Sequence, residues 1–102
     1  MIPRLRAIEE IVAAVAVVYN VLAVDIRGRA RTKGLAEARQ CICYVARGCT
    51  RMSFSEIGAA LNRDHTTIMA CTNSASRLMK NDPWFKSATD ELLAQFAPGC
   101  AS

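Results

Sequence analysis

The first pattern along the chain is a long apolar stretch. Residues from about Leu5 to Val24 are rich in Ala, Val, Ile and Leu and contain no strong helix breaker. This pattern predicts a helix that is apolar around most of its circumference, and such a helix is buried or paired with a partner. From Asp25 to Gly34 the periodicity stops and glycines appear, which predicts a loop.

Helical spacing returns at Leu35 and continues to about Cys49. The apolar stripe of this second helix consists of Leu35, Ala38, Ile42, Val45, Ala46 and Cys49. After a break at residues 50–52, Ser53 and Glu56 have the spacing of a capping box, in which each side chain can bond the other residue's backbone N–H. We therefore expect a short third helix from Phe54 to about Leu61.

A turn is expected at Asn62 and Arg63, and Asp64 carries the acceptor that can cap a helix beginning at His65. This helix continues to about residue 79, and its inward positions are Ile68, Cys71, Ala75 and Leu78. Asp82-Pro83 repeats the pattern of a cap followed by proline and predicts a last helix through Phe96. Residues 98–102 are expected to form a frayed tail.

The expected elements are all helical, because no alternating strand pattern, internal repeat or low-complexity tract occurs in the sequence. A chain of 102 residues has the length of one domain, so we predict an all-α bundle of about five helices over residues 1–97. The last helix, with Trp84 and Phe85, either completes the core or forms a dimer, and we favour the core.

The charge of the chain suits an anionic partner. Its formal net charge is +4 and its pI is about 9.0, and attraction to phosphates adds salt-sensitive affinity. Cations gather in the expected loop, where residues 27–33 read RGRARTK without an acid. Such a run is also typical of a solvated segment, so charge alone does not identify the partner.

Cysteine usage favours a reducing, cytoplasmic setting. The cysteines are odd in number and lack the paired C-x-x-C spacing of a zinc site, which predicts free thiols and no metal: Cys41, Cys43, Cys49, Cys71 and Cys100. The apolar run after Arg4 and Arg6 partly imitates a secretory signal. Glu9 and Glu10 stand where a signal is basic, however, and the run is short for a membrane span of roughly 20 residues. We expect no membrane partner.

Residues 53–79 have the order of a helix-turn-helix. In that motif the second helix places its N-terminal residues in the major groove, and here this helix opens with guanidinium, imidazole and hydroxyl groups. An ordinary helical hairpin with a polar corner would show the same pattern, so the pattern alone leaves both interpretations open.

The segment RDHTTIMAC (Arg63 to Cys71), preceded by SFSEIGAAL, resembles the DNA-binding domain of the bacterial replication initiator DnaA. The Arg39-Gln40 pair, the basic loop and the helix end at residues 19–25 occur in the same order, so the resemblance covers roughly residues 8–79. It implies a stand-alone DnaA-like protein with the Trp-repressor-like helix-turn-helix fold of that domain, and double-stranded DNA as its partner.

The resemblance also implies roles for three sets of residues. The set that reads bases in the major groove is Arg63, Asp64, His65, Thr66 and Thr67. The minor-groove residue is Arg31, with its neighbours Arg29 and Lys33 as further candidates. Phosphate contacts are expected from Arg39, Gln40, Arg47, Thr50 and Ser53. Asp64 also fits a purely capping role, and His65 a role in orienting the turn.

The sequence departs from the family in several places. A single Asn62 stands where the family usually has Gly-Gly, which predicts a tilted turn. Ala70, Asn73 and Ser74 replace a histidine and basic residues, which predicts weaker phosphate binding and leaves open whether the target is a standard DnaA box. No G-x-x-x-x-G-K-[ST] phosphate-binding loop occurs, so we expect the protein to bind no nucleotide and to have no ATPase activity. We expect no other cofactor.

Three functions remain open. The first is a sequence-selective regulator of transcription or replication, cytoplasmic and nucleoid-associated, of a kind that by analogy suits phage or prophage genomes. The second is an interaction module in which the first and last helices form a homodimer or dock on a replication protein. The third, an enzyme, is disfavoured because His65 is the only histidine and no cysteine is visibly placed beside it.

Overall fold

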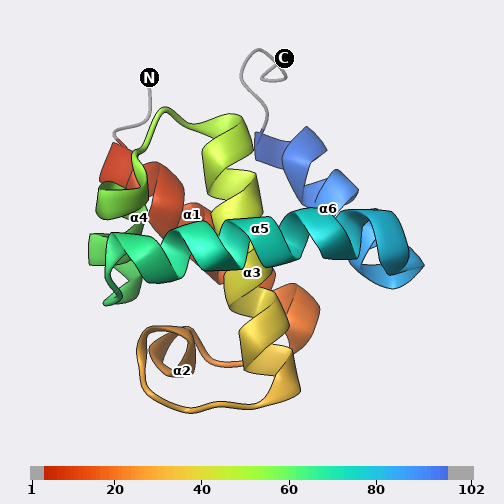
Figure 1. The fold of residues 1–102 in the computed structure, drawn as a ribbon, viewed down its shortest axis with the longest axis horizontal. Coiled ribbons are helices and arrows are strands. Elements are labelled where there is room, and N and C mark those ends of the chain that lie inside the picture. The colour runs from red at the N-terminus through yellow and green to blue at the C-terminus, as the bar shows by residue number, and fades with distance from the viewer. Residues whose placement is uncertain (1–3, 97–102) are drawn as a thin grey trace.

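In the computed structural model, the backbone of residues 4–96 and the side chains of residues 7–96 are described. Within this range the chain forms six helices and no strand (Figure 1), which confirms the all-α class. The helices are α1 (Arg4–Tyr19), α2 (Ala23–Arg27), α3 (Lys33–Cys49), α4 (Phe54–Leu61), α5 (His65–Asn81) and α6 (Pro83–Phe96). The tail expected at residues 98–102 and Cys100 lie outside the described residues.

The long first helix predicted through Val24 ends earlier, at Tyr19, and this accounts for the helix beyond the five expected. Asn20 has a left-handed backbone with φ of 54°, and the next N–H, of Val21, bonds back to the Ala16 carbonyl at 3.0 Å. A residue in this conformation commonly closes a helix, and asparagine tolerates it. The chain then turns into α2, which the sequence prediction divided between helix and loop.

Helix α3 lies at the centre of the bundle and packs against α1, α5 and α6. In Figure 1, α5 crosses in front of it. The predicted α3 stripe is buried from Leu35 to Ala46, and Cys49 at its end is half-buried. Side chains of α1, α4 and α5 pack into the same core, among them Ile11, Val15, Ile57, Leu61 and Ile68. Burying each such side chain contributes about 1.5–3 kcal/mol, so this core fixes the orientation of α4 and α5.

Helix α6 contributes to the same core. Phe85 is fully buried and Leu92 nearly so, while Asp82 caps the helix as predicted by accepting from the Phe85 N–H at 3.1 Å. Trp84 differs from the prediction that it packs inward. Its side chain is 55% exposed, and its ring meets that of Tyr19 edge to face at a centroid distance of 5.2 Å.

In the described part of the chain, Cys41, Cys43 and Cys71 are free thiols. Over the same residues, no group of His, Cys, Asp and Glu side chains is arranged to hold a metal ion. None of the described helices is long and apolar enough to cross a membrane.

Candidate nucleic-acid interface

Backbone contacts hold the turn between α4 and α5. Asn62 has a left-handed backbone with φ of 60°, and the Arg63 N–H donates to the Gly58 carbonyl at 2.8 Å. This approach leaves no room for a side chain at Gly58, where a Cβ would come within 3.0 Å of the Arg63 carbonyl oxygen. Gly58 was not singled out from the sequence, although a glycine inside an amphipathic helix often marks such a close approach.

The capping box at the start of α4 forms as predicted. The Ser53 hydroxyl accepts from the Glu56 N–H at 3.1 Å, and the Ser53 N–H donates to Glu56 Oε1 at 2.9 Å. Ser53, a predicted phosphate contact, is exposed on the surface. Its hydroxyl therefore starts the helix while remaining open to solvent.

Helix α5 begins with four exposed polar residues, Asp64 as its cap followed by His65, Thr66 and Thr67. Asp64 Oδ1 accepts from the Thr66 hydroxyl at 2.6 Å and from the Thr67 N–H at 2.9 Å. These donors lower the pKa of Asp64 to about 2, so its carboxylate is ionised at neutral pH. Four of the five residues predicted to read bases thus share one exposed helix end.

Arg63, the fifth member of that set, is placed differently. It is half-buried, and its guanidinium donates to the carbonyls of Leu61 at 2.7 Å, Gly28 at 2.6 Å and Arg27 at 3.4 Å. The side chain therefore points back toward the start of the basic loop and ties the turn to it.

Arg39 is also turned inward. Its side chain is 7% exposed, and it donates to the carbonyls of Ile26 at 2.9 Å, Asp25 and Ala30 at 2.8 Å each, and Gly28 at 3.2 Å. Burial, together with the nearby Arg63 charge, lowers the pKa of Arg39. The sequence predicted a phosphate contact here, whereas the guanidinium lies inside the loop.

The three minor-groove candidates lie on one exposed segment. Arg29 and Arg31 belong to the loop between α2 and α3, and Lys33 is the first residue of α3. Thr32 caps α3 by accepting from the Leu35 N–H at 3.1 Å. In Figure 1 this loop and α2 lie at the bottom of the view, below α5. The cations thus extend the exposed polar surface beyond the helix-turn-helix.

Arg47 and Thr50, two further phosphate candidates, make local contacts near the end of α3. The Arg47 guanidinium donates to the Met52 carbonyl at 2.8 Å and lies 4.4 Å from the centre of the Phe54 ring. The Thr50 hydroxyl donates to the Ala46 carbonyl at 2.6 Å. Arg47 is exposed and Thr50 half-buried, so the Arg47 charge remains on the surface.

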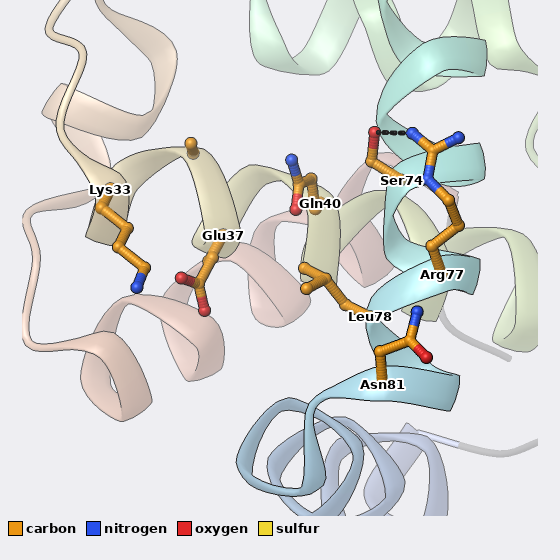
Figure 2. Close-up of a pocket in the computed structure, with 8 residues that line it drawn as sticks. Lys33, Glu37, Gln40, Ser74, Arg77, Leu78 and Asn81 are labelled. Atoms are coloured by element: carbon orange, nitrogen blue, oxygen red, sulfur yellow. Dashed lines mark hydrogen bonds between the residues drawn. The ribbon is translucent and has the colours of Figure 1, made fainter.

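A groove with a mixed polar and apolar lining runs between α3 and α5 (Figure 2). Its apolar side chains are Ala36 and Leu78, and its polar ones are Lys33, Glu37, Gln40, Ser74, Arg77 and Asn81. Arg77 is exposed and donates to the Ser74 hydroxyl at 3.2 Å. Its spacing from Thr66, Ala70 and Asn73 puts it on the same side of α5 as the start of the helix. Arg77 was not singled out from the sequence, although this spacing could have indicated it.

Comparison with known proteins confirms the resemblance to the DnaA family. The family model described as Bacterial dnaA protein helix-turn-helix matches residues 8–74. Over 74 residues the chain is 36% identical to the chromosomal replication initiator protein DnaA of Thermoanaerobacter sp. (strain X514) and to that of Thermoanaerobacter pseudethanolicus (strain ATCC 33223 / 39E). The aligned part is 72% of this chain but 17% of each relative, so the chain spans about a sixth of their length. A helix-turn-helix of this family indicates DNA binding, and the chain belongs to the bacterial DnaA helix-turn-helix family.

Proposed function

We propose that this protein binds double-stranded DNA sequence-selectively through α5 and the basic loop, and that it regulates transcription or replication without ATPase activity of its own. The exposed polar start of α5, residues 64–67, is the observation that carries this proposal. The buried faces of α4 and α5 and the tight turn at Gly58 hold this helix end in a fixed orientation.

The chemistry of residues 64–67 suits base edges in the major groove. The ionised Asp64 accepts hydrogen bonds, as a cytosine amine requires, and the threonine methyl groups suit the methyl group of thymine. His65 offers an imidazole donor or acceptor at the same helix end. Because Asp64 also caps α5, its contact with a base would add to a structural role already present.

Cations and uncharged polar side chains beyond this helix end supply the remaining contacts in this proposal. Arg31 enters the adjacent minor groove, flanked by Arg29 and Lys33, because a narrow minor groove attracts arginine. Phosphates are contacted by Gln40, Arg47 and Arg77, and by the hydroxyl groups of Thr50 and Ser53. These contacts fix the register of the protein on the duplex and do not read its sequence.

The proposal is tested by fluorescence anisotropy with labelled duplexes, one carrying a DnaA box and one scrambled, at two salt concentrations. We expect the box to bind about ten-fold or more tightly, and Thr67→Ala to remove this preference at a cost of about 1–3 kcal/mol. Ser87→Ala is the matched control, because Ser87 is an exposed hydroxyl on α6 outside this surface. Equal binding of both duplexes by the wild type would contradict sequence selectivity.

A second candidate function is protein interaction. It is favoured by apolar side chains that are exposed on α1, α2 and α6 and on the turn after Asn20: Val17, Leu22, Val24 and Trp84. In this case DNA binding is incidental, so a His65→Ala, Thr67→Ala double variant, which changes exposed residues, would lose DNA binding and retain its interaction with a partner protein. Loss of both together supports the DNA-binding regulator.

A further inference from the structure

Two arginines, Arg39 of α3 and Arg63 of the turn before α5, converge on one backbone carbonyl. The Gly28 oxygen accepts from Arg63 Nη2 at 2.6 Å and from Arg39 Nη2 at 3.2 Å. In the opposite direction, Arg27 Nε donates to the Ala60 carbonyl at 3.2 Å, from α2 to the end of α4. We refer to Arg27, Arg39 and Arg63 as the arginine hub. It links α2, the basic loop, α3 and the turn before α5.

The hub donates to a run of carbonyls where α2 ends and the loop begins, and one of these, the Asp25 carbonyl, also accepts the Gly28 N–H at 3.2 Å. Arg39 and Arg63 together donate to the carbonyls of Asp25, Ile26, Arg27, Gly28 and Ala30. A planar guanidinium carries five donors in a fixed geometry and can bind several acceptors at once, whereas a lysine ammonium is a compact point charge. The hub therefore depends on the fixed geometry of the guanidinium donors, and a lysine of equal charge would not replace it.

The hub also determines where the loop lies relative to α5. The carbonyls of residues 25–30 form the stem of the loop that presents Arg31, and Arg63 immediately precedes the cap of α5. We propose that Arg39 and Arg63 are positioning residues that hold Arg31 at a fixed offset from the start of α5, so that minor and major grooves are read as one footprint of fixed spacing. This proposal rests on the DNA-binding function proposed above.

Spacing tolerance distinguishes positioning from direct base contact. A first duplex carries an A/T-rich minor-groove segment beside the site read by α5, and a second carries one additional base pair between them. For the wild type we expect the insertion to weaken binding roughly ten-fold, the range typical of one mismatched position. For Arg63→Lys, which retains the charge, we expect weaker binding to the first duplex and a penalty for the insertion below about two-fold.

Hydrogen exchange of the free protein tests the hub without DNA. The Ile26 and Gly28 N–H groups donate to the Leu22 and Asp25 carbonyls, and their opening is opposed by the hub contacts. We expect Arg63→Lys to exchange faster at both amides. Arg51→Lys is the matched control, because Arg51 is exposed between α3 and α4, and it should exchange like the wild type.

The outcomes separate the two proposals. If the wild type shows no preference among duplexes, the proposed function fails, while amide exchange still tests the hub. If Arg63→Lys loses preference at a single base pair and keeps the full insertion penalty, Arg63 is a base contact and the positioning role is overturned. Unchanged exchange in both Arg39→Lys and Arg63→Lys overturns it as well. If Arg39→Lys fails to fold, the comparison of Arg63→Lys with the wild type is sufficient, because Arg63 is only half-buried.

Discussion

Replacing Gly58 by alanine adds one methyl group where α4 and the following turn approach most closely. Gly58 is buried, and its carbonyl accepts the Arg63 N–H at 2.8 Å. An added Cβ would lie within 3.0 Å of the Arg63 carbonyl oxygen and 3.4 Å from the carbonyl carbons of Arg63 and Asp64. All three are backbone atoms, so rotation of a side chain cannot relieve the contact and the turn must move.

Two opposing effects determine the change in stability. Alanine is preferred to glycine inside a helix by roughly 1 kcal/mol. Forcing a methyl group into a closely packed site typically costs about 1–3 kcal/mol. At Gly58 we expect a cost in the upper part of this range, because backbone atoms must move. The contact therefore outweighs the helix preference, and we expect a net loss of about 1–2 kcal/mol. For a domain of this size, this corresponds to a decrease in Tm of about 5–15 °C.

Thermal unfolding followed by far-UV circular dichroism measures this change, with Gly34→Ala as the matched control. Gly34 is in the first turn of α3, where a Cβ would meet its nearest atoms, on Thr32 and Val21, at 4.0 Å. Alanine there should raise stability by about 0.5 kcal/mol. If Gly58→Ala is at least as stable as the wild type while Gly34→Ala behaves as expected, the close approach does not explain the glycine and the reasoning is refuted.

Three further predictions concern the cap of α5, the groove and the last helix. The pKa of Asp64 is held at about 2, below its ordinary 3.8, so its capping contribution is complete above about pH 4 and lost as the pH falls through about 2. The Tm difference between wild type and Asp64→Ala should therefore be constant from pH 7 to about pH 4 and vanish near pH 2; a difference that persists there contradicts this. Arg77→Ala should weaken binding to box and scrambled duplexes equally and reduce the slope of log K against log salt by about 1, and an unchanged slope removes Arg77 from the interface. Phe85→Ala should cost about 3–5 kcal/mol in chemical denaturation because Phe85 is fully buried, whereas Trp84→Ala should cost far less because Trp84 is 55% exposed; similar losses for both would contradict this placement.

The bounds of the central helices could be predicted because local chemistry marks them. Helix α4 extends from Phe54 to Leu61 as predicted, since the hydroxyl and carboxylate of its capping box lie three residues apart. Helix α5 begins at His65 because Asp64 caps it through the Thr67 N–H. Such signals act within one helical turn and do not depend on the rest of the fold.

The end of α1 and the roles of two arginines depend instead on contacts that are distant in the chain. Asparagine does not by itself end a helix, and the turn at Asn20 is accompanied by burial of Ile26 of α2 in the core. The acceptors of Arg39 lie 9 to 14 residues away, and Arg63 reaches Gly28 across 35 residues. The motif that contains Arg63 implies a contact with DNA. It contains no signal that the guanidinium bonds carbonyls of the loop instead.

The arginines of this interface thus form two sets with different physical tasks. In this proposal, exposed cations such as Arg29 attract phosphates at all sequences, and their contribution weakens with salt. The hub donates guanidinium N–H groups to backbone carbonyls inside the protein, and in the positioning role proposed above this orders the loop before DNA binds, which lowers the ordering cost of binding. The two sets should therefore separate in one experiment. Arg29→Ala should lower the salt slope and leave the insertion penalty intact, whereas Arg63→Lys should leave the slope intact and remove the penalty. If both variants change the slope and the penalty together, the division between attraction and positioning does not hold.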